Sequence, residues 1–140
     1  MIEIEPYKAV GGIAFNSSID DALAHFGPPL KRLRNPDNHD ELHYKDFIAR
    51  FDNGLREFTL LPRAEARIDG LSVSWDKSFV DDLLRLDGEI QEVCGCLVSL
   101  KLGIAMTGIH DQDEPQMAIH AFRLGDWDVL KDDMQPYHRE

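Results

Sequence analysis

Hydrophobic side chains near the N-terminus recur with the spacing of one face of an α-helix. An apolar stripe at i, i+3, i+4 and i+7 is formed by Ile19, Ala22, Leu23 and Phe26. Ser17 or Ser18 is suited to cap the start of this helix, and Gly27, which is followed by two prolines, is suited to end it. The pattern predicts a short amphipathic helix over residues 18–26, which must pack on an apolar surface because it is too short to persist alone.

A second segment, residues 78–86, repeats this pattern. Asp76 or Ser78 can cap it, and its apolar stripe consists of Phe79, Leu83 and Leu86. The two segments align with identical residues at Ser18/Ser78, Asp21/Asp81 and Leu23/Leu83. We interpret this alignment as an internal duplication.

Extended segments follow each predicted helix. In the first half they are Leu30–Arg34, Leu42–Phe51 and Leu55–Leu61, and in the second half Ile90–Leu100, Leu102–Ile109 and Met117–Arg123. Asn53-Gly54 predicts a tight hairpin between two of them. A further helical turn or two is expected within Trp127–Met134.

These elements predict an α+β fold with one sheet. Two tandem helix-plus-three-strand repeats would form one antiparallel sheet, with both helices packed on one face. We expect a single domain over residues 1–140, with repeat one at about 11–62, repeat two at about 70–123 and a C-terminal tail at 124–140.

The chain is strongly acidic, with a net charge of −11 at pH 7 and an isoelectric point of about 4.8. Nucleic acids and anionic membrane surfaces need a basic footprint, so neither is an expected partner. No apolar run approaches the ~20 residues of a membrane span, and Met1–Pro6 lacks the features of a signal peptide. We therefore expect a cytoplasmic protein, whose acidity suits rapid association with a basic protein partner.

Histidine and cysteine residues do not match a known metal-binding pattern. His39 and His43 are four residues apart, but Glu41 does not directly follow the first histidine as it does in zinc proteases, and the segment leads into a predicted strand. Cys94 and Cys96 have no second cysteine pair, which favours reduced thiols over a redox pair or half of a metal site. We predict no catalytic residues, no metal and no cofactor, and hence no enzyme.

The two aligned segments share an aromatic residue, a polar pair and the motif Ser-x-x-Asp-x-Leu, and the first ends in Phe26-Gly27-Pro28. This pattern resembles the β-lactamase-inhibitor-protein-like architecture, whose opening helix commonly closes in Leu-Gly-x-Pro. The resemblance covers about residues 11–123, and it implies the tandem-repeat sheet described above. Small acidic cytoplasmic proteins of this type are often bacterial immunity proteins. The resemblance thus implies an inhibitor that neutralises a cognate toxin, although the secreted inhibitors of that fold carry a signal peptide.

The two halves differ in the connection before their last strand. The first uses the minimal turn at residues 52–54, whereas the second uses the longer segment 110–115. Connections longer than structure requires often carry function. A solvated loop and a divalent-cation site are the alternatives for this segment. We predict a surface that binds the basic cleft of a toxin, formed by His110, Asp111, Asp113, Glu114, His120 and Glu57. The rival hypothesis is a small-molecule-binding domain or an enzyme that uses the open face of the sheet.

Overall fold

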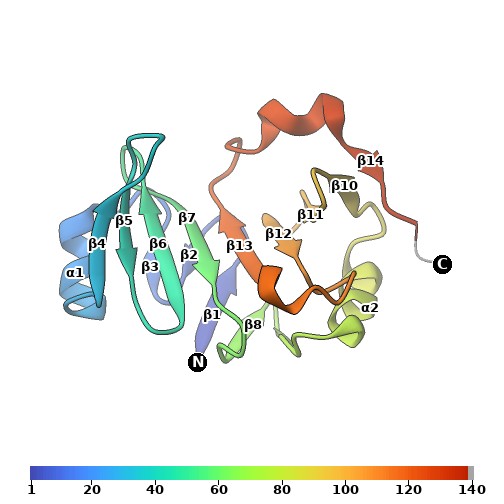
Figure 1. Cartoon of the computed structure of the whole chain (residues 1–140), viewed down its shortest axis with the longest axis horizontal. Coiled ribbons are helices and arrows are strands. Elements are labelled where there is room, and N and C mark those ends of the chain that lie inside the picture. The colour runs from blue at the N-terminus through green and yellow to red at the C-terminus, as the bar shows by residue number, and fades with distance from the viewer. Residues whose placement is uncertain (139–140) are drawn as a thin grey trace.

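The computed structural model describes residues 1–138 and arranges 14 β-strands of that part of the chain in two sheets (Figure 1). The five-stranded sheet has the order β3 (Ile13–Ala14), β2 (Ala9–Val10), β1 (Ile2–Glu5), β8 (Ala66–Ile68) and β9 (Leu71–Ser72). The nine-stranded sheet has the order β14 (Gln135–Pro136), β10 (Gln91–Val93), β11 (Cys96–Ser99), β12 (Ile104–Thr107), β13 (Ala118–Phe122), β7 (Leu55–Leu60), β6 (Phe47–Phe51), β5 (Asp40–His43) and β4 (Lys31–Arg34). Residues 139–140 of the predicted C-terminal tail lie outside the described residues.

Two α-helices, α1 (Ile19–Phe26) and α2 (Lys77–Leu86), lie where the sequence predicted them, near opposite ends of the molecule (Figure 1). Ser18 caps α1, because its hydroxyl accepts a hydrogen bond from the Asp21 N–H at 3.0 Å. Gly27 ends the helix with φ = 81°, a conformation that glycine adopts without strain. Asp76 caps α2 by accepting from the Ser78 N–H at 3.0 Å.

Within the nine-stranded sheet, a run of four strands, not three, follows each helix, and the chain adds β8 and β9 after the first run and β14 after the second. The run β4–β7 follows α1 and the run β10–β13 follows α2, and the two runs join edge to edge through β7 and β13. Two short 3-10 helices lie in the second half, η1 (Glu114–Gln116) before β13 and η2 (Asp128–Asp133) before β14.

The predicted fold class is wrong. The protein is mainly β with two sheets, not an α+β arrangement of helix-plus-three-strand repeats on one antiparallel sheet. The sequence pattern predicts no strand within residues 1–14 and 66–72, yet these residues supply the strands of the five-stranded sheet. Its strands are too short for hydrophobic alternation to be visible in sequence. Its central pair, β1 and β8, is parallel, with Ile2 opposite Ala66.

Two of the predicted strands are hairpins. The segment Leu42–Phe51 is interrupted by a turn in which the Tyr44 N–H donates to the Phe47 carbonyl at 2.9 Å. The segment Ile90–Leu100 turns at Cys94 and Gly95, which have φ values of 52° and 80°. Neither turn contains the Asn-Gly pair or the proline that marks the turns predicted from sequence. For this reason the sequence pattern did not reveal either turn.

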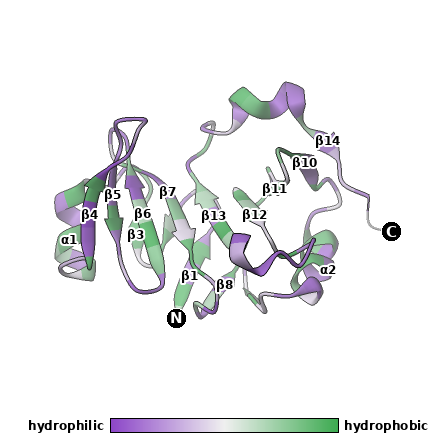
Figure 2. Ribbon diagram, in the orientation of Figure 1, coloured by the Kyte–Doolittle hydropathy of each residue, from purple (hydrophilic) through white to green (hydrophobic). Residues whose placement is uncertain are grey.

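The main hydrophobic core lies between the two sheets and the helices. Phe47 and Phe58 stack in its centre with ring centroids 4.4 Å apart, and Phe26 of α1 lies 4.9 Å from Phe47. Ile4 and Ile68 of the five-stranded sheet are buried in the same cluster. Figure 2 shows hydrophobic residues concentrated along the central strands and hydrophilic residues in the connections.

Candidate functional site

The face of the nine-stranded sheet that points away from the main core has two unlike halves. Over β10–β12 and around Phe122 of β13 it is apolar, and the segment 124–134 covers it. Trp127 of this segment stacks on Phe122, with ring centroids 5.1 Å apart and an interplanar angle of 23°. Over β5–β7 the same face carries charged residues. The open sheet face expected from sequence is therefore half covered by the C-terminal segment.

Charges alternate across the strands in the polar half. Glu41 on β5 lies opposite Arg50 on β6, and Arg50 lies opposite Glu57 on β7. Arg50 Nη1 is 3.2 Å from Glu57 Oε2, and Arg50 Nε is 3.5 Å from Glu41 Oε2. One guanidinium thus bridges two carboxylates, which is the pairing that opposite charges on neighbouring strands favour.

A histidine stands at each end of this row. His43 donates from Nε2 to Glu41 Oε1 at 2.8 Å. At the other end, His120 Nδ1 lies 2.9 Å from the Thr59 hydroxyl, with which it forms a hydrogen bond, and 3.7 Å from Glu57 Oε2. We call the connected set of six residues the polar strip, and its members are Glu41, His43, Arg50, Glu57, Thr59 and His120.

Trp127 contacts the polar strip at the border between the apolar and polar halves of this face. Its indole Nε1–H donates to Glu57 Oε1 at 3.1 Å. Glu57 is only 7% exposed, and a carboxylate so buried needs charged or donating partners. These partners are Arg50, His120 and Trp127. Through Trp127, the segment that covers the apolar half is therefore linked directly to the charged residues of the polar half.

Burial and pairing act in opposite directions on the pKa values of the polar strip. Burial lowers the pKa of His120 below its ordinary value of 6.5, against the opposing influence of Glu57. Burial alone would raise the pKa of Glu41, but hydrogen bonds from Asn35 and His43 and the charge of Arg50 outweigh it and hold the pKa below 4.5. These directions favour a neutral imidazole at His120 and an ionised carboxylate at Glu41 at neutral pH.

The second candidate region is the acidic loop, the connection 108–117 between β12 and β13. Asp111, Asp113 and Glu114 are all exposed. Asp111 Oδ1 accepts weakly from the Asp113 N–H at 3.4 Å, and Glu114 lies 3.7 Å from Arg63, where both side chains are mostly solvated. These contacts contribute little to stability, because exposed ion pairs are weak. The carboxylates are thus available to an outside partner.

His110 differs from its acidic neighbours. Its ring packs edge-on against Tyr137, with centroids 6.1 Å apart, and its Nδ1 is buried without a hydrogen-bond partner among the described residues. This contact joins the start of the acidic loop to the segment after β14. His110 therefore anchors the loop, while the carboxylates that follow it face solvent.

The structure divides the six residues predicted from sequence into two groups. Glu57 and His120 meet in the polar strip, although they are far apart in the chain, and the other four lie in the acidic loop. Sequence reasoning missed Arg50 and Trp127. The only available signal for Arg50 was its position on the polar side of an alternating strand, and nothing local placed Trp127 beside Glu57.

His39 and His43, considered as a metal pair, bind different carboxylates. His39 Nε2 lies 3.5 Å from Asp52 Oδ2, while His43 pairs with Glu41. Within residues 1–138, no group of three or more His, Cys, Asp or Glu side chains is placed to hold a metal ion. No helix in the described part of the chain is long and apolar enough to cross a membrane.

No family model, curated protein or solved structure matches this chain. The resemblance to the β-lactamase-inhibitor-protein-like architecture remains a prediction with respect to function.

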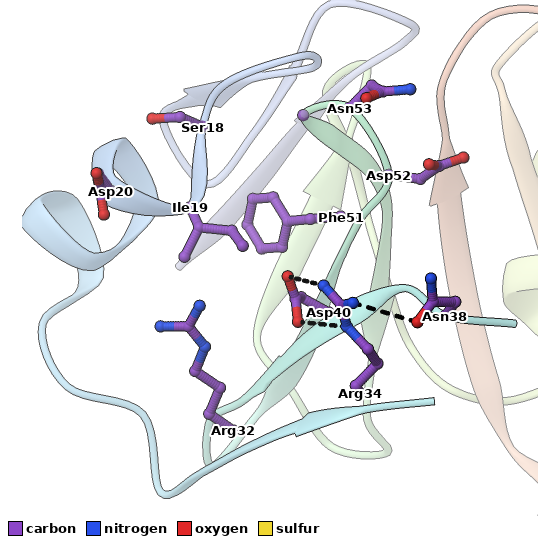
Figure 3. A pocket seen from close by; sticks show the side chains of 11 residues that line it. Ser18, Ile19, Asp20, Arg32, Arg34, Asn38, Asp40, Phe51, Asp52 and Asn53 are labelled. Atoms are coloured by element: carbon purple, nitrogen blue, oxygen red, sulfur yellow. Dashed lines mark hydrogen bonds and ion pairs between the residues drawn. The ribbon is translucent and has the colours of Figure 1, made fainter. Parts of the chain in front are cut away.

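A hollow of about 510 Å³ opens between α1 and the edge of the nine-stranded sheet (Figure 3). Ile19 and Phe51 form its apolar floor, and Arg32 and Arg34 of β4 form one wall. Arg34 is fixed by two hydrogen bonds of 3.3 Å to Asp40. These hydrogen bonds from the guanidinium hold the pKa of Asp40 below its ordinary value of 3.8.

Proposed function

We propose that this chain is a protein-binding inhibitor, an immunity protein that neutralises a cognate bacterial toxin in the cytoplasm. The acidic loop is the observation that carries this proposal. It exceeds what a hairpin connection needs, and it exposes three carboxylates that scarcely contribute to the fold. A toxin with a basic cleft, built to hold an anionic substrate, is the partner that this surface fits.

Electrostatic steering is the physical reason for such an arrangement. A chain with a net charge of −11 attracts a basic partner over long distances, and the protruding carboxylates orient the encounter. An inhibitor of a toxin benefits from rapid capture, since every free toxin molecule acts until it is bound. His110, packed against Tyr137, would hold the loop in a fixed position and so reduce the ordering cost of binding.

The polar strip supports the same function by a different route. Its charges are largely neutralised by one another. The buried Glu57 positions Arg50 and His120, which are partly exposed and offer a partner shape and hydrogen bonds more than net charge. We expect them to determine which toxin is bound, whereas the acidic loop determines how fast it is bound.

The test begins with the partner and ends with its association rate. Tagged full-length chain captures the partner from the source organism, and mass spectrometry identifies it; a neighbouring gene for a large protein with a C-terminal toxin domain would agree. A variant with Asp111→Lys, Asp113→Lys and Glu114→Lys should unfold at nearly the wild-type temperature. Its association rate constant with that partner should fall by about tenfold or more at low salt.

A matched variant separates local contact from overall charge. Glu65→Lys, Asp132→Lys and Asp133→Lys change the net charge by the same amount at exposed sites outside the acidic loop. We expect this control to slow association much less. Equal effects of the two triple variants, or an unchanged rate and salt dependence in the loop variant, would refute the role of the loop.

A further inference from the structure

Among the strands of residues 1–138, β4 ends the nine-stranded sheet and has a neighbour, β5, on one side only. At the turn that joins them, the Asn35 N–H donates to the His39 carbonyl at 2.9 Å. Hydrogen-bonded and non-hydrogen-bonded pairs alternate along an antiparallel ladder, so Leu33 directs its backbone groups toward β5. The N–H and C=O groups of Arg32 and Arg34 consequently point outward, where a further strand can pair with them.

This edge is basic, although the protein as a whole is acidic. Three of the four residues of β4 are Lys31, Arg32 and Arg34, and all three are exposed. Arg34 is engaged by Asp40, but the side chains of Lys31 and Arg32 have no hydrogen bond or ion pair within residues 1–138. Leu30, immediately before the strand, is 79% exposed. The edge therefore combines outward backbone groups, unpaired cations and an exposed apolar side chain.

The hollow beside α1 lies on the face of the sheet from which Arg32 and Arg34 project (Figure 3). Residues at i and i+2 of a strand share a face, so both arginines line the hollow, with Phe51 and Ile19 as its floor. Its remaining lining includes Asp20, Asp40 and Asp52, so the basic character belongs to the β4 edge and not to the whole hollow. A strand paired with β4 would direct every second side chain to this face. Carboxylates at those positions would lie beside Arg32, and near Arg34, whose guanidinium Asp40 already engages. The alternate side chains would lie beside Leu33 on the other face.

We propose that β4 and the adjoining hollow form a docking edge for an extended acidic segment of a partner protein, which adds as a tenth strand. Charge complementarity selects this occupant. A second copy of the chain would bring Lys31, Arg32 and Arg34 opposite like charges, which disfavours pairing between two β4 edges. The same cations that prevent self-association thus favour a strand of opposite charge. This edge is separate from the acidic loop and requires no property of it.

The probe is a synthetic peptide, N-acetylated and C-amidated, with the sequence Glu-Val-Glu-Val-Glu-Val, added to the 15N-labelled full chain. Amide resonances of β4 should shift on titration, and hydrogen exchange of the Arg32 and Arg34 amides should slow at saturation by about tenfold or more. The Leu33 amide, already paired with β5, should change little. The Lys-Val peptide of equal length should bind at least about tenfold more weakly.

Charge-reversal variants of the β4 edge provide the second test of the proposal. Arg32→Glu should weaken binding of the Glu-Val peptide by about tenfold or more, and Lys31→Glu should act in the same direction. Arg85→Glu, on the exposed surface of α2, is the matched control and should leave binding unchanged. The triple lysine variant of the acidic loop should also bind the peptide at least as well as wild type, so the two proposals can fail separately.

Three results would overturn the proposal. They are equal affinity for the Glu-Val and Lys-Val peptides, resonance shifts that cluster outside β4, and equal binding by the Arg32→Glu and Arg85→Glu variants. Absence of any shift at millimolar peptide would overturn it as well. Because Lys31 and Arg32 are exposed, both reversals should keep the wild-type spectrum, which is checked before titration.

Discussion

Replacing Trp127 with phenylalanine tests whether one hydrogen bond fastens the C-terminal segment to the polar strip. The change removes the indole Nε1–H, 3.1 Å from Glu57 Oε1, but keeps a ring that can stack on Phe122. A hydrogen bond to a charged group contributes about 1.5–3 kcal/mol. Glu57 keeps its ion pair with Arg50 at 3.2 Å, so its carboxylate still has a charged partner. We therefore expect the unfolding free energy to fall by about 1.5 kcal/mol, near the lower limit of that range.

Trp127→Ala separates packing from hydrogen bonding. This variant loses the stacked pair with Phe122 and part of the apolar cover in addition to the donor. Aromatic pairs contribute about 0.5–1.5 kcal/mol beyond burial, so the total loss should reach about 3 kcal/mol. The difference between the two variants measures the packing of the aromatic ring that phenylalanine retains at position 127.

Urea unfolding followed by far-ultraviolet circular dichroism supplies both free energies, provided that the slope stays constant across the variants. Glu57→Gln, made alone and together with Trp127→Phe, completes a double-mutant cycle. Contacting residues in one network couple by about 0.5–3 kcal/mol. A loss below about 0.5 kcal/mol for Trp127→Phe, or a coupling energy near zero, would refute the reasoning, since the segment would then be held by packing alone.

Two further predictions concern the core and the response to pH. Leu83 of α2 is fully buried, so Leu83→Ala should lower the unfolding free energy by about 2–5 kcal/mol, and a loss below about 0.5 kcal/mol would show that this face of α2 is not packed. Because the folded pKa of His120 is depressed, the unfolded chain binds the proton more readily, and stability should decline as pH falls through about 6.5. Unfolding curves between about pH 5 and 8 should show a weaker decline in His120→Gln, and an identical decline would contradict the assignment to His120.

Local chemistry explains why both helices were found from sequence. Ser18 and Gly27 bound α1 through a side-chain cap and a left-handed glycine, interactions made within a few residues of the helix. The Asn53-Gly54 turn is equally local, with φ values of 53° and 99° that suit these two residues. Such signals act over one or two turns of chain, so a single sequence displays them directly.

The polar strip illustrates what local patterns leave undetermined. The sequence predicts that Glu57 and His120 belong to one binding surface, but it does not indicate that β7 and β13 are neighbours. The hydrogen bond between Thr59 and His120 spans 61 positions, and that between Glu57 and Trp127 spans 70. Strand order and register set these distances, and both follow from how all strands pack together.

The sequence by itself determined the helices, the strongest strands, the acidity of the chain and the exposed position of the acidic loop, because capping, periodicity and charge are local properties. Only the tertiary structure decided the second sheet, the hairpins within Leu42–Phe51 and Ile90–Leu100, and the basic edge at β4. Short strands have almost no periodicity of their own, and they become strands when a neighbour satisfies their backbone hydrogen bonds. That neighbour, as with β1 and β8, is often distant in the chain.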